Sequence, residues 1–176
     1  ETRTAGAVGI RAQAHVDFAA VMARMRARRA DIAPHDSASR LAALGVDVFF
    51  GRARFTGRST IAVGETPPNH PDGNAPARVS GSQTSLSFRK AVIATGSRPA
   101  IPPVPGLAGV PFVTNETIFD LREQPRDLLV LGGGPIGCEL AQAFARLGTH
   151  VTLIQDSPQV LPREDEDAAA LVSAAL

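Results

Sequence analysis

The chain has 176 residues, and its 18 basic and 17 acidic side chains give a formal net charge of +1. That balance offers no electrostatic basis for binding nucleic acid or an anionic membrane surface, and no apolar run approaches the roughly 20 residues needed to span a bilayer. Cys138 is the only cysteine, so the sequence contains no internal disulfide, no redox-active cysteine pair and no multi-cysteine metal site. We expect a cytoplasmic protein. Because the sequence begins with neither an initiator methionine nor a signal peptide, we also expect it to be a segment of a larger chain.

The first part of the sequence favours helices. Between residues 16 and 30, apolar side chains recur at helical spacing, and four arginines fall mainly on the other faces. Such an arginine-rich face is typical of a solvated helix surface. A second, short helix is predicted to end over residues 42–45, where Gly45 suits a helix terminus.

Between residues 46 and 95 the pattern changes to short β-type runs separated by glycines. The runs are residues 46–50, 53–55, 59–63, 85–90 and 91–95. Residues 65–82 are rich in Pro, Gly, Asn and Ser and hold almost no apolar side chain, so we expect a long exposed hairpin loop there. Together the runs predict a small antiparallel meander followed by a buried strand over residues 91–94.

A proline-rich stretch follows the predicted meander. Proline removes a backbone donor and fixes φ, so residues 96–106 cannot be helical and are expected to form a semi-rigid connector. Beyond it, residues 115–121 predict a short helix. A new pattern begins at Leu128.

A glycine-rich turn between two apolar runs is the clearest functional signal. Residues 128–131 are an apolar run of the kind buried in parallel sheets. They lead into Gly132-Gly133-Gly134-Pro135-Ile136-Gly137, which matches the G-x-G-x-x-G pattern. Good helix formers follow over residues 139–147, Gly148 ends that helix, and residues 150–154 predict a second strand. This context indicates a dinucleotide-binding turn, the alternative being a purely structural glycine turn in another α/β sheet.

The three glycines of the pattern have different tasks. Gly132 allows the tight turn, Gly134 lets backbone amides approach a pyrophosphate, and Gly137 lets the helix pack close to the strand. The amino terminus of the helix then offers unpaired N–H groups and a partial positive charge to the anion. We therefore predict that this turn binds the pyrophosphate of a dinucleotide.

The residues that end the second predicted strand bear on the choice between NAD and NADP. An acid is expected about 20 residues after the glycine turn, where it holds the ribose hydroxyls of NAD. Gln155 and Asp156 stand there instead. Gln155 can hydrogen-bond a hydroxyl but carries no charge to repel a 2′-phosphate, and Asp156 either supplies that charge or caps the next turn. The nearest basic residue, Arg163, could reach a 2′-phosphate only if residues 157–160 fold back, so the sequence slightly favours NAD.

Four segments carry a resemblance to a known family: Ala94-Thr95-Gly96-Ser97-Arg98-Pro99, the proline-rich connector, Gly132–Glu139, and Leu161-Pro162-Arg163-Glu164-Asp165. Together they resemble the flavin-dependent pyridine nucleotide–disulfide oxidoreductases, and within them the mercuric reductase and dihydrolipoamide dehydrogenase group. The resemblance is strongest over residues 88–167. It implies an α/β fold with parts of two Rossmann-like dinucleotide-binding domains, an NAD(P)-binding domain being inserted into an FAD-binding domain.

The resemblance also implies a division of the chain and a set of cofactor contacts. Residues 1–114 would be the later part of the FAD-binding domain, and residues 115–176 would begin the NAD(P)-binding domain. The positions that match the family's FAD contacts are Ala53, Thr95, Gly96 and Ser97. The positions that match its NAD(P) contacts are Gly132, Gly133, Gly134, Pro135, Ile136, Gly137, Glu139 and Gln155, with Glu139 close to the nicotinamide and the flavin.

Three features of that family do not occur in the sequence. They are the first glycine fingerprint, which holds the FAD pyrophosphate, the Cys-x4-Cys disulfide, and the carboxy-terminal dimerisation domain with its His–Glu pair. We therefore expect an internal fragment of a homodimeric enzyme, with no catalytic residue and no metal site of its own and no turnover alone. The histidines, His15, His35, His70 and His150, are expected to be surface or structural residues, and Cys138 a packed thiol.

For the whole protein, the resemblance implies that hydride passes from a nicotinamide through FAD to a disulfide, a dithiol or a metal-ion acceptor. Its partners would then be a small-molecule or disulfide substrate, with no nucleic acid and no membrane. Two alternatives stay open. One is a nucleotide-binding fragment without catalysis, and the other is a flavoprotein without the disulfide, such as an NADH oxidase or a ferredoxin reductase.

Overall fold

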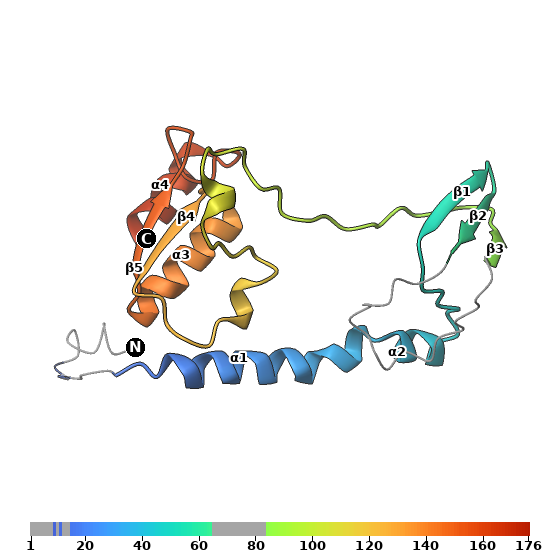
Figure 1. The fold of residues 1–176 in the computed structure, drawn as a ribbon, viewed down its shortest axis with the longest axis horizontal. Coiled ribbons are helices and arrows are strands. Elements are labelled where there is room, and N and C mark those ends of the chain that lie inside the picture. Colours follow the sequence, from blue (N-terminus) through green and yellow to red (C-terminus); the bar gives the residue numbers. More distant parts are fainter. Residues whose placement is uncertain (1–8, 10, 12–14, 65–83) are drawn as a thin grey trace. The chain divides into compact units, whose positions relative to one another are not determined.

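The computed structural model describes residues 9, 11, 15–64 and 84–176 (Figure 1). The α-helices are α1 (Phe18–Ile32), α2 (Ala38–Ala43), α3 (Pro135–Leu147) and α4 (Glu166–Ala175), and the strands are β1 (Ala53–Gly57), β2 (Thr60–Val63), β3 (Thr84–Ser87), β4 (Asp127–Leu131) and β5 (His150–Ile154). Short 3₁₀ turns are η2 (Ala33–Asp36), η3 (Leu107–Gly109) and η4 (Ile118–Asp120). The described residues form two compact units, one within residues 27–98 and the other made of those up to residue 26 together with 99–176.

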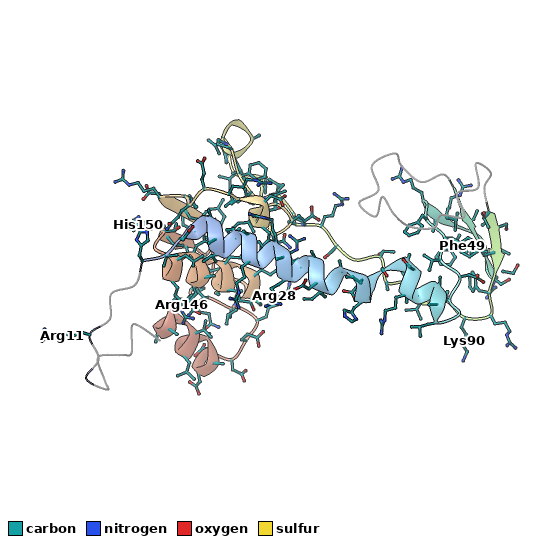
Figure 2. All side chains as sticks on the ribbon, turned by 90° about the horizontal axis from the view of Figure 1, so that it is seen from below. Arg11, Arg28, Phe49, Lys90, Arg146 and His150 are labelled. Atoms are coloured by element: carbon teal, nitrogen blue, oxygen red, sulfur yellow. The ribbon has the colours of Figure 1, made fainter. Side chains whose placement is uncertain are left out.

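Helix α1 begins where its sequence provides a cap. Asp17 Oδ1 accepts from the Ala20 N–H at 3.0 Å, which satisfies one of the free amides at a helix start. The helix runs two residues beyond the predicted end at residue 30. Its arginine face is solvated as expected at Arg28, whose guanidinium meets Asp31 at 3.1 Å with both side chains exposed (Figure 2). Helix α2 starts at the Ser37 cap and is followed by Gly45, with φ +84°.

The unit within residues 27–98 contains the predicted antiparallel meander. Strands β1, β2 and β3 form one sheet in that order, and Ile61 lies between Phe55 on β1 and Leu86 on β3. A register shift separates Phe55 from Gly57, so β1 carries a bulge near its end. The predicted hairpin loop over residues 65–82 lies outside the described residues.

Two of the predicted strands are not strands. Residues 46–50 and 91–95 have no regular structure, and β3 ends at Ser87 rather than continuing to residue 90. Val92 and Ile93, expected to be buried, are 92% and 72% exposed. The physical reason is that a strand requires a hydrogen-bonded neighbour, and among the described residues no strand pairs with this apolar run.

The other unit contains the predicted β-turn-α-β segment. β4 and β5 pair in parallel, with Leu128 opposite Val151 and Leu131 opposite Ile154, and α3 connects them and packs against both. α3 begins at Pro135, four residues before the predicted start, because proline is well suited to the first helical position. Gly148, with φ +100°, ends the helix as predicted.

The core of this unit lies between α1, η4 and α3. Phe18, Met22, Ile118 and Phe144 are each 5% exposed and form one apolar cluster, and the rings of Phe18 and Phe144 lie 5.9 Å apart. The predicted helix over residues 115–121 is only the short 3₁₀ turn η4, whose Ile118 contributes to the cluster. No prediction covered α4.

The observed architecture is α/β, as predicted. That the chain contains parts of two Rossmann-like domains stays a prediction. Within the part of the chain that the structure describes, no helix is both long and apolar enough to cross a membrane.

Candidate dinucleotide-binding site

The glycine turn connects the end of β4 with the start of α3. The Gly132 N–H donates to the Ile154 carbonyl at 2.8 Å, so the pairing with β5 continues one residue past β4. Gly132 then takes φ +107°, a conformation that residues with a side chain rarely adopt. Glycine at this position therefore lets the chain leave the sheet and enter the helix at once.

Gly137 sets how closely α3 approaches the strand before it. A Cβ built on this residue would clash with the Gly132 carbonyl oxygen and lie 3.6 Å from Val130 Cγ1. The helix and the turn are thus in contact through backbone atoms. The close packing expected of the third glycine of the pattern is present.

Gly134 faces open space at the amino terminus of α3. It is the N-cap residue of the helix, with φ −73° and ψ 179°, and no side chain caps the helix there. A Cβ built on Gly134 would have no other heavy atom within 4 Å. The first turn of a helix has N–H groups without intrahelical partners. Here these N–H groups and the positive end of the helix dipole face open space, and such a place suits an anion.

Gly133, in contrast, is held entirely by the protein. The residue is buried, and its N–H donates to Gln155 Oε1 at 2.5 Å. Its carbonyl oxygen accepts from the Leu161 N–H at 2.7 Å and lies 3.3 Å from Cys138 Sγ. Gly133 is therefore fixed within the protein through both its N–H and its carbonyl oxygen, whereas Gly134 lies at the open face.

The structure brings Gln155 against the glycine turn. Its Nε2 donates to Asp156 Oδ1 at 2.8 Å and to Ser157 Oγ at 2.9 Å, so the amide hydrogen-bonds at both ends. The sequence identified Gln155 but not this contact with Gly133, which lies 22 residues earlier in the chain. The predicted contact of Gln155 with a ribose stays a prediction.

The segment after β5 folds back over the turn. Leu161 makes its backbone contact to Gly133, and Val160 Cγ1 would lie 3.2 Å from a Cβ on Gly133. The condition under which Arg163 could approach the site, a folded-back loop, is thus met by the backbone. Leu161 has φ +51°, unusual for a residue with a side chain, and nothing in the local sequence indicates it.

The positions matched to FAD contacts lie in the unit within residues 27–98. Ala53 is exposed on β1 and pairs with Val63, and Thr95–Ser97 are exposed in a stretch without regular structure. Gly96 takes φ +67°, and a Cβ on it would meet nothing within 4 Å. Glu139, matched to the nicotinamide side, is exposed on α3 in the other unit.

The other residues considered from the sequence are the four histidines and Cys138. His150, at the start of β5, lies exposed with Nδ1 3.1 Å from Asp127 Oδ1 (Figure 2), and His15 and His35 are also exposed. His70 lies outside the described residues. Cys138 is 5% exposed, and burial raises the pKa of its thiol. In the described ranges no three His, Cys, Asp or Glu side chains gather in a way that could hold a metal ion.

Comparison with known proteins identifies the family of this chain. The family model described as pyridine nucleotide-disulphide oxidoreductase matches residues 12–176. The chain belongs to this family.

Relatives within the family are similar over most of the chain. A probable pyridine nucleotide-disulfide oxidoreductase, RclA of Escherichia coli, is 35% identical over 125 residues, which are 70% of this chain and 25% of the relative. A mercuric reductase of Lysinibacillus sphaericus is 32% identical over 74% of this chain and 20% of the relative.

A solved structure supports the same fold. That of the HOCl-induced flavoprotein disulfide reductase RclA from Escherichia coli matches with a TM-score of 0.69 and 29% identity, over 91% of this chain and 33% of that chain. The chain thus spans between a fifth and a third of the length of these relatives.

Proposed function

We propose that this chain is part of an FAD-dependent NAD(P)H oxidoreductase. In the complete protein, hydride passes from a nicotinamide through the flavin to a disulfide, a dithiol or a metal-ion acceptor. The cofactors supply that redox chemistry when bound. The residues of this chain bind and orient them. Membership of the family, among whose members are a mercuric reductase and a flavoprotein disulfide reductase, supports the class of reaction.

The observation that carries the proposal is the open, uncapped start of α3. Gly134 leaves space for a pyrophosphate where a side chain would stand, and Gly132 and Gly137 give the backbone its shape. We assign the nicotinamide dinucleotide to this turn, with Pro135, Ile136 and the surrounding glycines as its contacts. Glu139 completes these contacts, and Gln155 belongs to the proposed site as the residue that hydrogen-bonds the turn at Gly133. NAD is slightly preferred over NADP, since the exposed carboxylate of Asp156 follows Gln155 directly, whereas the basic residue Arg163 comes eight residues after Gln155.

In this proposal the residues that contact the flavin lie in the unit within residues 27–98, and the FAD-binding domain extends beyond that unit on both sides. Residues 1–114 contribute the later part of an FAD-binding domain, and residues 115–176 begin the NAD(P)-binding domain. Ala53 and Thr95–Ser97 are the contacts to FAD. The exposed backbone of Gly96, with free space where a Cβ would be, is compatible with the close approach of a flat ligand.

The test is Gly134→Val in the complete protein. A valine side chain would fill the space that the phosphates require, whereas the backbone angles of Gly134 suit any residue and no protein atom lies in the way. We expect nucleotide binding to be lost with the fold intact. Titration with NADH and NADPH measures the first, and a thermal unfolding curve the second.

A matched control is Gly109→Val. A Cβ on Gly109 also meets nothing within 4 Å, but this residue lies in η3, away from the glycine turn in sequence. The control should bind both nucleotides as the wild type does. Unchanged affinity of Gly134→Val for both nucleotides would reject the assignment of the pyrophosphate to this turn.

A further inference from the structure

The side-chain amide of Gln155 is fully engaged within the protein. Oε1 accepts from the Gly133 N–H, and Nε2 donates to Asp156 Oδ1 and Ser157 Oγ. These partners also fix which end is which, because a flipped amide would set its NH2 group against an N–H and its oxygen against a carboxylate. Both amide hydrogens are therefore in use, and the oxygen already has a strong donor.

The contact with Gly133 stabilises the turn where it is buried. A buried N–H needs an acceptor, and Gln155 Oε1 supplies it at 2.5 Å. The two residues are also packed together, since a Cβ on Gly133 would lie 3.2 Å from that oxygen and 3.3 Å from Gln155 Cβ. Gln155 thus fixes the position of Gly133 at the end of the sheet, and through the chain it also fixes the backbone N–H of the next residue, Gly134.

Asp156 has the complementary properties. Its side chain is exposed, and Oδ1 is oriented by Gln155 Nε2 at 2.8 Å and by Ser157 Oγ at 3.3 Å. A carboxylate held in this way at the end of β5 has the charge that Gln155 lacks, and a fixed negative charge disfavours a second anionic group nearby.

We propose that Gln155 is a positioning residue that holds the glycine turn and orients Asp156, and that the Asp156 carboxylate discriminates against the 2′-phosphate of NADP. This inference rests on the proposed function, because it requires a nicotinamide dinucleotide at the turn. It gives Gln155 an internal role at the turn and moves the negative charge of the usual strand-end acid to Asp156.

The experiment compares Asp156→Asn, Gln155→Glu and Gln155→Leu in the complete protein, with kcat and KM measured for NADH and for NADPH. Asp156→Asn should lower the ratio of kcat/KM for NADH to that for NADPH by about tenfold, the effect of one charge-assisted contact. Gln155→Glu keeps the acceptor for Gly133 but sets a second carboxylate beside Asp156 in place of the donor, so a higher ratio in this variant identifies Gln155 as the ribose contact only if Asp156→Asn leaves the ratio unchanged. Gln155→Leu should raise KM for both nucleotides about tenfold with little change in kcat, as expected when uniform binding is lost.

Gln159→Leu is the matched control. Gln159 lies in the same segment, and its Nε2 donates to the Glu164 carbonyl at 3.2 Å within that segment. Both KM values should match those of the wild type. If Gln155→Leu does not fold, the ratios for Gln155→Glu and Asp156→Asn still decide.

Two results would overturn the inference in different ways. A tenfold rise in NADH preference for Gln155→Glu, with the Asp156→Asn ratio unchanged, would make Gln155 itself the residue that contacts the ribose and leave the proposed function standing. A wild-type protein that binds neither nucleotide would overturn the proposed function and the inference together.

Discussion

The two backbone polar groups of Gly133 illustrate how single residues determine this site. Its N–H and its carbonyl oxygen are both bonded to protein groups, from Gln155 and from Leu161. Leaving one such buried group without a partner typically costs about 1–3 kcal/mol. These two hydrogen bonds therefore hold the turn at Gly133 in place.

Cys138 should be a slow nucleophile in the folded protein. The thiolate is the reactive form, and burial both raises the pKa of Cys138 and leaves it 5% exposed. We expect iodoacetamide at pH 8 to alkylate the native thiol more slowly than the urea-unfolded chain, because the raised pKa lowers the thiolate fraction and burial limits access of the reagent. Mass spectrometry over time gives both rates.

The same shift has a defined effect on stability. Because the folded pKa is raised, the fold favours the neutral thiol. The stability that the neutral Cys138 thiol contributes is fully present below the pKa of the unfolded chain and is lost as pH rises through the pKa of the folded protein.

Equal alkylation rates in the folded and unfolded states would show that Cys138 is accessible and that its assignment as a packed thiol is wrong.

At the scale of the elements, the contact between α3 and the end of β4 depends on Gly137. In an exposed helix interior, replacing glycine by alanine stabilises by about 1 kcal/mol. Here the added methyl would clash with the Gly132 carbonyl oxygen. We expect Gly137→Ala to destabilise by about 1–3 kcal/mol instead, as overpacking does, measured as a lower urea midpoint at an unchanged m value.

Gly109→Ala provides the comparison for that sign. A Cβ on Gly109 meets no atom within 4 Å, so the free energy of unfolding of Gly109→Ala should stay within about 0.5 kcal/mol of the wild-type value. A stabilised Gly137→Ala would mean that α3 can move away from the turn without cost.

The contact between α1 and α3 depends on one aromatic pair. Phe144 is 5% exposed, and its ring lies 5.9 Å from that of Phe18. Phe144→Ala should therefore lower the free energy of unfolding by about 3–5 kcal/mol. Circular dichroism during urea unfolding measures it. Arg146→Ala, an exposed change in the same helix, should cost no more than about 0.5 kcal/mol. Similar losses for the two variants would place the stabilising contacts elsewhere.

At the scale of the whole molecule, the chain carries only part of each proposed cofactor site. The positions matched to FAD, Ala53 and Thr95–Ser97, are exposed. The family's first glycine fingerprint, which holds the FAD pyrophosphate, does not occur in the sequence. We expect the purified 176-residue chain to be colourless. The complete protein, purified in parallel, should show yellow flavin absorbance. Stoichiometric flavin on the short chain would mean that its flavin contacts suffice for binding.

The sequence by itself determined the β4–turn–α3–β5 unit and the family. Local signals agree there, because the conformation of Gly132 and the closeness of Gly137 to backbone can be met only by glycine, and α3 buries one apolar face at Cys138, Ala141 and Phe144. The run over residues 91–95 was predicted wrongly because a strand depends on a neighbour as well as on its own composition.

Only the tertiary structure decided what surrounds the turn. The bond between Gln155 and Gly133 joins residues 22 apart, and that between Leu161 and Gly133 depends on a left-handed leucine. Composition and spacing place Gln155 at the end of a strand, and both a ribose contact and an internal contact are compatible with that place. The internal contact follows from the path of residues 157–161, because a chain that folds back over the turn buries the Gly133 amide, which then requires an acceptor.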